Sequence, residues 1–284
     1  MTDPATPASH STAASEPSPA PIGVIGGSGF YSFLDDATEV AVPTPFGEPS
    51  SPVTLGAVGG RQVAFVPRHG RDHRFAPHRV NYRANLWALR ALGVRQVLAP
   101  CAVGSLRAEN GPGTIVLPDQ VVDRTWGREH TVYDAEGPVV HVSMADPYCP
   151  RGRRAVLDVA NDTGEHVVDG GTLVVINGPR FSSRAESHWH SAAGWSVVGM
   201  TGMPEAAIAR ELAICLTSIA LVTDLDAGVA EGEGVTHHEV LEVFARNVER
   251  LKAMLGHVVP TMPTDDDCGC RHALDGQRLP FDLP

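Results

Sequence analysis

The stretch Ile22-Gly23-Val24-Ile25-Gly26-Gly27-Ser28-Gly29 decides the fold class, because a short apolar strand runs directly into a glycine-rich turn. Glycines allow backbone amides to converge on an oxyanion, and the Ser28 hydroxyl adds a donor, so the turn suits anion binding. A plain tight turn is the alternative interpretation. The turn lacks the third glycine and the later acidic residue of a dinucleotide fingerprint, so no NAD site is expected.

Outward from this stretch, strand patterns alternate with helical patterns along the chain. Strands are expected at residues 63–66, 96–100, 114–122, 172–176, 196–199 and 217–223. Helices are expected at residues 81–92, 151–161, 183–193, 204–212 and 236–255, the last beginning with Thr236 and Glu239 in capping-box spacing. This alternation predicts an α/β fold with a mixed central sheet flanked by helices and a site at the carboxyl ends of the strands.

The composition predicts one domain between two tails. Residues 1–20 are low in complexity and are expected to be disordered, residues 21–260 form the domain, and residues 261–284 form an irregular tail. The formal charge of −11 argues against a nucleic-acid surface, because neutralising phosphates takes clustered Lys and Arg. No apolar run is long enough to cross a membrane and the N-terminus does not resemble a secretory signal, so a cytoplasmic protein is expected.

The five cysteines do not indicate a disulfide framework in a chain of 284 residues. Two of them form Cys268-Gly269-Cys270 near the C-terminus. This segment is expected to lie in a solvated tail, with a mobile or crosslinking thiol pair as the alternative.

The segment Pro67-Arg68-His69-Gly70-Arg71-Asp72-His73 places cationic and imidazole groups directly after a predicted strand. An Arg side chain can bind two phosphate oxygens at once, and a His can donate one more hydrogen bond. A metal site is the alternative, because the chain has 13 histidines. Their local spacing is not that of a helix carrying paired ligands and a supporting acid, so no metal is expected.

Two further segments leave predicted strands and enter predicted helices. Gly178-Pro179 sets a rigid turn that can present Phe181 to a cleft as a flat stacking surface, although Phe181 alone equally suits a core. Met200-Thr201 places Thr201 near a helix N-terminus, where a further phosphate donor is useful.

Asp224 and Asp226 end the apolar strand predicted at residues 217–223. Because they occupy alternate positions, an extended chain points both carboxyls to the same side. Paired acids suggest a metal, but no His or Cys nearby completes such a site. Two carboxyls against an apolar wall can also share a proton, and a carboxyl with a raised pKa donates to a leaving group at neutral pH.

Seven motifs occur together in this chain, and each of them alone is only weakly specific for a protein family. They are Ile25-Gly26-Gly27-Ser28-Gly29, Arg68-His69-Gly70, Val80-Asn81-Tyr82-Arg83-Ala84-Asn85, Gly104-Ser105-Leu106-Arg107, Gly178-Pro179-Arg180-Phe181-Ser182-Ser183-Arg184-Ala185-Glu186, Met200-Thr201 with Pro204-Glu205, and Thr223-Asp224-Leu225-Asp226. Over about residues 22–255 they resemble the methylthioadenosine phosphorylase branch of the trimeric purine nucleoside phosphorylase family. The resemblance implies a nucleoside phosphorylase fold, a homotrimer, inorganic phosphate as co-substrate, and neither a cofactor nor a metal.

The matching positions imply a role for each site residue. The resemblance places phosphate against Ser28, Arg68, His69, Cys101, Ala102 and Thr201. It places Met200 beneath the ribose, and Phe181 and Ser182 against the base. Asp224 and Asp226 would face the N7 and 6-amino edge of the purine. The 5′ substituent would lie among His237, Val240 and Leu241, and His141 of a neighbouring subunit would approach the 5′ end.

The residue types favour an adenine-type base. The branch that acts on 6-oxopurines carries Asn where this chain has Asp224 and Glu where it has Ser182. A carboxylate accepts a hydrogen bond from an amino group but repels a carbonyl unless it is protonated. Two positions depart from the closest relatives: Cys101 replaces Thr and removes a hydroxyl donor, and His237 replaces a small apolar residue and can bond a 5′-hydroxyl. The 5′ substituent therefore stays open between methylthio, hydroxyl and another small group.

The expected activity is phosphate-dependent cleavage of the N-glycosidic bond of 5′-methylthioadenosine or a related 6-aminopurine nucleoside. The products are the free base and a ribose 1-phosphate. One alternative is a broader phosphorylase that accepts adenosine, or 6-oxopurine nucleosides such as inosine and guanosine. The other is a nucleoside-binding protein without catalytic activity.

Overall fold

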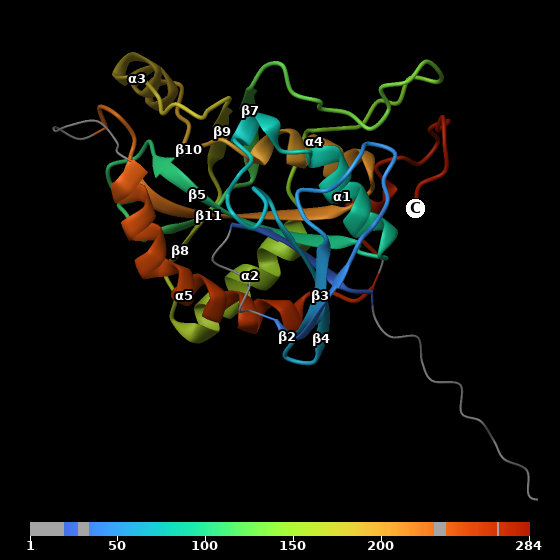
Figure 1. The fold of residues 1–284 in the computed structure, drawn as a ribbon. Coiled ribbons are helices and arrows are strands. Elements are labelled where there is room, and N and C mark those ends of the chain that lie inside the picture. Colours follow the sequence, from blue (N-terminus) through green and yellow to red (C-terminus); the bar gives the residue numbers. More distant parts are fainter. Residues whose placement is uncertain (1–19, 28–33, 230–236, 266) are drawn as a thin grey trace, which may run out of the picture.

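The computed structural model describes residues 20–27, 34–229, 237–265 and 267–284 (Figure 1). The predictions about the N-terminal segment, Ser28 and the capping pair that begins at Thr236 therefore fall outside the described residues.

The described chain forms a mixed sheet with helices on its two faces, as the sequence predicts. The strands are β1 (Ile22–Gly26), β2 (Asp35–Val40), β3 (Val53–Val58), β4 (Arg61–Pro67), β5 (Gln96–Ser105), β6 (Ile115–Leu117), β7 (Gln120–Arg124), β8 (Val167–Asp169), β9 (Thr172–Ile176), β10 (Val197–Gly199) and β11 (Cys215–Leu225). The helices are η2 (Pro77–Arg79), α1 (Tyr82–Ala91), α2 (Pro150–Thr163), α3 (Arg184–Ala192), α4 (Gly202–Glu211), α5 (His237–Thr261) and η3 (Gly269–His272).

The sheet is built around β1, β5 and β11. β1 is buried along its whole length and pairs in parallel with β4 and β5, and β5 pairs in parallel with β11. Antiparallel pairs extend this core, with β5 beside β10, β3 beside β4 and β6 beside β11. The parallel strands in the centre bring several carboxyl ends to one edge, where loops with functional side chains can meet.

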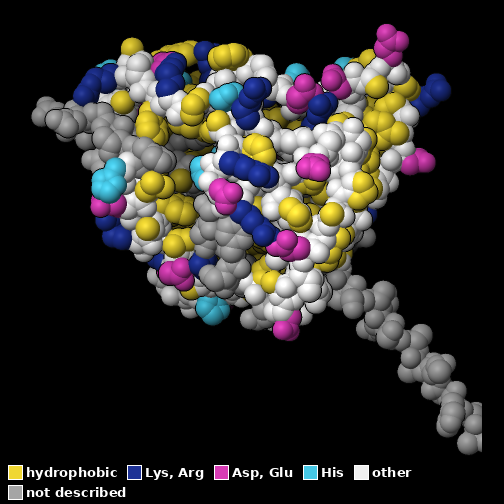
Figure 2. Space-filling model, in the orientation of Figure 1, with side chains coloured by type: hydrophobic (Ala, Val, Ile, Leu, Met, Phe, Trp, Pro, Cys, Tyr) yellow, Lys and Arg dark blue, Asp and Glu magenta, His cyan; other side chains and the backbone are white. Residues whose placement is uncertain are grey.

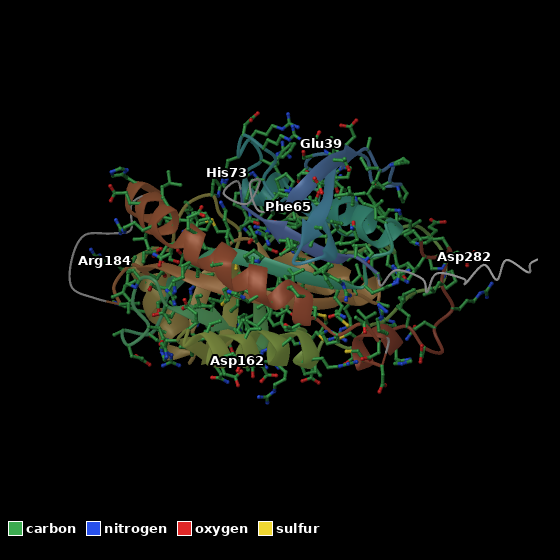
Figure 3. The ribbon with its side chains drawn as sticks, turned by 90° about the horizontal axis from the view of Figure 1, so that it is seen from below. Glu39, Phe65, His73, Asp162, Arg184 and Asp282 are labelled. Atoms are coloured by element: carbon green, nitrogen blue, oxygen red, sulfur yellow. The ribbon has the colours of Figure 1, made fainter. Side chains whose placement is uncertain are left out.

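Two apolar clusters attach the helices to the sheet. On one face, α2 and α5 cover residues such as Phe65 and Ile219, and on the other α1 and α4 cover Ile25 and Val97. Figure 1 shows these helix pairs below and above the strands. Figure 3 shows Phe65 inside the molecule, whereas Asp162 near the end of α2 points outward. Each large apolar side chain buried in this way stabilises the fold by roughly 1.5–3 kcal/mol.

Local capping explains where several helices begin. Asn81 precedes α1 and its side chain accepts a hydrogen bond from the Ala84 backbone N–H. Ser183 precedes α3 and forms a capping box with Glu186, in which each side chain accepts from the other residue's backbone N–H. These caps fix the entry of the chain into helices that begin directly after loops near the site.

The structure corrects some predicted boundaries. Residues 114–122 were expected as one strand, but they form β6 and β7, because Pro118 between them lacks a backbone donor and the two segments pair with different neighbours. β2, β3 and β8 were not predicted, since their sequences are short, polar or interrupted by glycine. β5 and α5 continue beyond their predicted ends, to Ser105 and Thr261.

No helix in the part of the chain that the structure describes combines the length and apolar character of a membrane span. On the face shown in Figure 2, basic and acidic side chains are interspersed, and hydrophobic side chains gather toward the upper right.

Candidate active site

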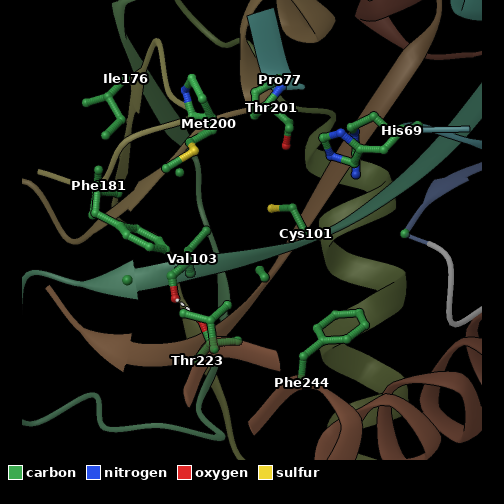
Figure 4. A pocket seen from close by; sticks show the side chains of 18 of the residues that line it. His69, Pro77, Cys101, Val103, Ile176, Phe181, Met200, Thr201, Thr223 and Phe244 are labelled. Atoms are coloured by element: carbon green, nitrogen blue, oxygen red, sulfur yellow. Dashed lines mark hydrogen bonds between the residues drawn. The ribbon is translucent and has the colours of Figure 1, made fainter. Parts of the chain in front are cut away.

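A cavity of about 510 Å³ opens at the carboxyl ends of the central strands. Most residues predicted for the site line it: Arg68, His69, Cys101, Ala102, Phe181, Ser182, Met200, Thr201, Asp224, Asp226, Val240 and Leu241. The close-up in Figure 4 shows side chains from separate strands and loops turned toward the same space. The structure therefore brings together residues that lie up to about 170 positions apart in the sequence.

Three predicted residues are not placed in this cavity. Ser28 and the side chain of His237 lie outside the part of the chain that is described, although Gly27 does line the cavity. His141 is exposed in the segment between β7 and α2, where its carbonyl accepts a hydrogen bond of 3.0 Å from Gln277, and it does not line the cavity of its own chain.

Arg68 is held rigidly at the wall of the cavity by a buried carboxylate. Its Nε and Nη2 atoms donate to the two oxygens of Glu205, and both side chains are 3% exposed. Nη2 also donates to the Ile25 carbonyl, and Nη1 donates to the Pro100 carbonyl. Because a guanidinium has five N–H donors, this leaves one N–H for a ligand. A grip on two phosphate oxygens by Arg68 therefore does not fit this arrangement.

The charge of Arg68 is maintained in this buried position. Burial alone would lower the pKa of Arg68, but the Glu205 carboxylate outweighs burial and raises the pKa above its ordinary value. Since Glu205 neutralises much of that charge, the cavity draws further positive potential from elsewhere. Arg74, which no sequence motif indicated, lines the cavity and stands over the Phe75 ring at 4.9 Å.

His69 is a neutral imidazole at physiological pH. Burial and the adjacent Arg68 lower the pKa of His69 to about 4. Its Nδ1 lies 2.8 Å from the carbonyl oxygen of Phe75, which can only accept, so Nδ1 carries the hydrogen and Nε2 is an acceptor. The expected donation from His69 thus goes to the protein backbone, and a ligand would meet a hydrogen-bond acceptor at Nε2.

Thr201 and Cys101 face the same part of the cavity as His69 (Figure 4). Thr201 directly precedes α4 and its side chain makes no capping hydrogen bond, so the hydroxyl is available to a ligand. The backbone of Met203 is extended, so the regular part of the helix begins only after it. Burial raises the pKa of the Cys101 thiol, which keeps it neutral and a weak donor. A thiol at this position is thus a weaker hydrogen-bond donor than a hydroxyl would be.

The two carboxyls occupy the opposite part of the cavity, at the end of β11. The Thr223 hydroxyl lies 2.8 Å from Oδ2 of Asp224, and the backbone N–H of Asp226 donates to the Ser105 carbonyl at 2.9 Å. Gly104 on β5 makes room for both, because a Cβ there would lie 2.9 Å from Oδ1 of Asp224 and 3.4 Å from Cβ of Asp226. Both acids line the cavity, and side-chain atoms of both approach the same position on β5, at Gly104.

Two buried polar atoms of the lining have no hydrogen-bond partner among the described residues. They are Oδ2 of Asp226 and Oγ of Ser182. A buried polar atom without a partner costs about 1–3 kcal/mol, so such atoms in a cavity are expected to meet polar groups of a ligand. This end of the cavity can accept from an N–H group through Asp226 and exchange one further hydrogen bond through Ser182.

Apolar side chains complete the cavity between and beside these polar ends. Phe181 and Met200 lie on one side (Figure 4), so Phe181 faces the cavity and is not a core residue. Val240, Leu241 and Phe244 come from the first turns of α5 and form an apolar wall. The cavity thus combines an anion-binding region, an acidic region and flat or apolar surfaces between them.

The comparisons with known proteins agree with this geometry. A family model described as the phosphorylase superfamily matches residues 21–260. The chain belongs to this superfamily.

Relatives within the phosphorylase superfamily are similar over nearly their whole length. A purine nucleoside phosphorylase of Streptomyces coelicolor is 62% identical over 274 residues, which cover 93% of this chain and 98% of the relative. An S-methyl-5′-thioadenosine phosphorylase of Mycolicibacterium smegmatis is 53% identical over 264 residues, covering 93% and 99%. The structure of methylthioadenosine phosphorylase from Schistosoma mansoni in complex with adenine matches with a TM-score of 0.83 and 38% identity, covering 87% of this chain and 93% of that one. The resemblance to the methylthioadenosine phosphorylase branch is confirmed.

Two residues that position the site of this phosphorylase were missed in the sequence. Glu205 stood in a recognised motif, but nothing local indicated that it would pair with Arg68, 137 positions away. Arg128 is buried and donates to the carbonyls of Asn177, Met200 and Met203. It thereby fixes the loops that follow β9 and β10. An arginine in a segment without periodicity gives no sequence signal for such a role.

Proposed function

We propose that this protein cleaves 5′-methylthioadenosine and related 6-aminopurine nucleosides with inorganic phosphate, giving the free base and a 5-substituted ribose 1-phosphate. The observation that carries the proposal is a single cavity with anion-binding groups at one end and two carboxyls at the other. The names of the relatives from Mycolicibacterium smegmatis and Schistosoma mansoni support it. The proposed reaction needs no metal and no cofactor beyond inorganic phosphate.

Phosphate would bind between Arg68 and Thr201. Arg68 offers one N–H, the Thr201 hydroxyl offers another donor, and Arg74 adds positive charge at the mouth. Nε2 of His69 would accept from the hydroxyl of a monoprotonated phosphate or from a ribose hydroxyl. Because Glu205 holds Arg68 rigidly, this guanidinium needs little reorganisation when the anion binds.

The reaction exchanges one bond at C1′ of the ribose for another. The C1′–N9 bond breaks and its electron pair leaves with the purine, so positive charge develops on the sugar. A phosphate oxygen on the opposite face stabilises that charge electrostatically and then forms the new C1′–O bond. A protonated Asp224 would donate to N7 of the departing purine, which neutralises the leaving group.

The acidic region favours a 6-aminopurine. The unpartnered Oδ2 of Asp226 can accept from an exocyclic amino group, whereas a 6-carbonyl would face like partial charge there. Phe181 would stack on the base and Met200 would lie beneath the ribose.

The apolar wall of α5 favours a methylthio group at the 5′ position. Val240, Leu241 and Phe244 offer carbon surface but no hydrogen-bonding group to a 5′-hydroxyl. A broader specificity that includes adenosine is the second candidate. It is favoured by the 62% identical relative from Streptomyces coelicolor, which is called a purine nucleoside phosphorylase.

The proposed assembly is the homotrimer that the family resemblance implies. Val139, which lies close to His141, is 74% exposed, and Trp126 in the same segment is 75% exposed. These two exposed apolar side chains are therefore accessible to a neighbouring subunit. In the trimer, His141 of a neighbouring subunit would reach the 5′ end of the nucleoside. Light scattering on the purified protein measures the number of subunits.

A panel of substrates tests the proposed activity. Purified protein is incubated with methylthioadenosine, adenosine and inosine, each with and without phosphate, and the free base is quantified. We expect phosphate-dependent release of adenine from methylthioadenosine, and much slower release of hypoxanthine from inosine. Base release that is independent of phosphate would identify a hydrolase and overturn the proposal, and a preference for inosine would overturn the assigned base.

A further inference from the structure

Four of the five cysteines meet at the end of the molecule away from the active site. They are Cys149, Cys215, Cys268 and Cys270, all buried, and their sulfur atoms all lie within 4.8 Å of one another. They come from three separate places in the fold. Cys149 precedes α2, Cys215 begins β11, and Cys268 and Cys270 lie at the start of η3 and within it. The expectation that Cys268 and Cys270 lie in a solvated tail is therefore wrong.

We propose that these four cysteines bind one structural zinc ion. Tetrahedral zinc sites with four thiolates have Zn–S bonds of about 2.3 Å, which place the sulfur atoms about 3.8 Å apart. The Sγ atoms of Cys149 and Cys268 are 3.6 Å apart, and the remaining separations stay within 4.8 Å. A multinuclear iron–sulfur cluster would place irons and sulfides between the thiolates and require a wider spacing.

The four sulfur atoms form one compact group and not two separate pairs. All of them are free thiols in the structure, and each lies near the three others. Soft thiolate ligands in a closed tetrahedral arrangement select zinc among the common divalent ions. The adjoining hollow has room for about 10 Å³, enough for an ion or a water molecule but for no organic ligand.

The surroundings suit a negatively charged metal complex. Four thiolates around one Zn²⁺ leave two negative charges, and the guanidinium group of Arg271 lines the same hollow as three of the cysteines. Arg151 and Asp265 also line this hollow, but they form a bidentate ion pair with each other and together add no net charge. The backbone N–H of Gly152 lies 3.5 Å from Sγ of Cys149, at the positive end of α2. Outer hydrogen bonds of this kind orient metal ligands and stabilise the thiolate form.

A zinc ion here would attach the C-terminal segment to the domain. Beyond the cysteines, Phe281 packs against Tyr133 and Trp87 with ring centroids 5.2 and 5.6 Å apart. The cysteines would therefore fix one end of a segment whose other end packs on the face of the sheet that α1 and α4 cover. Cys215 begins β11 and Asp224 lies nine residues further along the same strand, so the cluster is about 30 Å from the catalytic acids. The ion would stabilise the fold and take no part in the reaction.

Metal analysis of the full-length protein tests the proposal. The protein is purified without chelators after expression with zinc in the medium, and its metals are quantified by inductively coupled plasma mass spectrometry. We expect about one zinc ion per chain, as four-cysteine structural sites bind. The double variant Cys268→Ser/Cys270→Ser should lose it, whereas Cys101→Ser, which changes the one cysteine outside the cluster, should keep it.

Two measurements on the unaltered protein keep the test decisive if the double variant does not fold. Replacement of zinc by cobalt(II) should give the visible absorption bands of a tetrahedral thiolate site. A mercurial reagent that titrates the thiols should release the zinc in step with the modification of four cysteines. A protein without zinc would overturn the proposal, whether non-reducing mass spectrometry shows four free thiols or two disulfides. A multinuclear iron cluster in place of zinc would overturn it as well.

Discussion

The buried pair between Arg68 and Glu205 predicts a large loss of stability when its carboxylate is removed. In Glu205→Gln the shape of the side chain is kept, but Arg68 is left as a buried cation with one acceptor in place of a bidentate carboxylate. Both side chains are 3% exposed, so solvent cannot replace the lost partner. Breaking such a pair costs about 3–5 kcal/mol. Because Gln keeps one accepting oxygen, we expect the free energy of unfolding to fall by about 3 kcal/mol. For a domain of this size this corresponds to a fall in Tm of about 6–12 °C.

Thermal and urea unfolding of purified variants measure this loss against a matched control. Glu249→Gln removes an exposed carboxylate, 77% accessible, from its pair with Lys252, and should change stability by less than about 1 kcal/mol. The double variant Arg68→Met/Glu205→Leu should recover much of the stability of Glu205→Gln, because no unpaired charge remains buried. It should nevertheless bind phosphate poorly. If Glu205→Gln proves as stable as Glu249→Gln, the pair does not hold the site as described.

Three further predictions follow from single contacts. Gly104→Ala would place a methyl 2.9 Å from Oδ1 of Asp224 and should lower kcat/KM about 10- to 100-fold. The control Gly111→Ala meets nothing within 4 Å and should keep the original kcat/KM. Equal kcat/KM values for the two variants would contradict the role of Gly104. The pKa of His69 is about 4 in the fold against 6.5 in a free side chain, so the unfolded chain binds more protons between these values and the unfolding free energy falls as the pH drops through this window. The unfolding free energy falls by up to about 3 kcal/mol across this window. Urea unfolding at about pH 7 and about pH 4.5 should show a smaller fall in His69→Gln than in the unaltered protein, and the same fall in both would refute the low pKa of His69. Phe244→Ala should raise KM about 10-fold more for methylthioadenosine than for adenosine in steady-state assays. An equal rise for both substrates would show that the apolar wall of α5 does not contact the 5′ substituent.

The sequence allowed much of the site to be predicted because its residues follow strands. In a sheet with parallel central strands, segments such as Arg68-His69 and Asp224-Leu225-Asp226 reach one edge whatever their separation along the chain. Met200-Thr201 reaches the same cavity from β10, which runs antiparallel to β5. The strand and helix patterns in the sequence predicted the elements around these segments in the order in which the structure has them. The role of each residue at that edge came from the family resemblance.

What escaped prediction depends on contacts between distant segments. The pairing of Glu205 with Arg68 and the contacts of Arg128 arise only after the strands have assembled. No local sequence pattern predicts these contacts. The cysteine cluster was missed for the same reason, because Cys149 and Cys215 stand far from Cys268-Gly269-Cys270 in the sequence. The strand predicted over residues 114–122 failed because periodicity does not tell which neighbour each half will pair with.

The most direct test of the proposed phosphorolysis follows phosphate itself. Phosphorus NMR of a reaction that contains the protein, methylthioadenosine and inorganic phosphate records the co-substrate and the sugar phosphate together, while chromatography of the same sample measures adenine. We expect the phosphate signal to decrease and a phosphate monoester signal to grow in equal amounts with the adenine released. Adenine released while the phosphate signal stays constant would contradict the account.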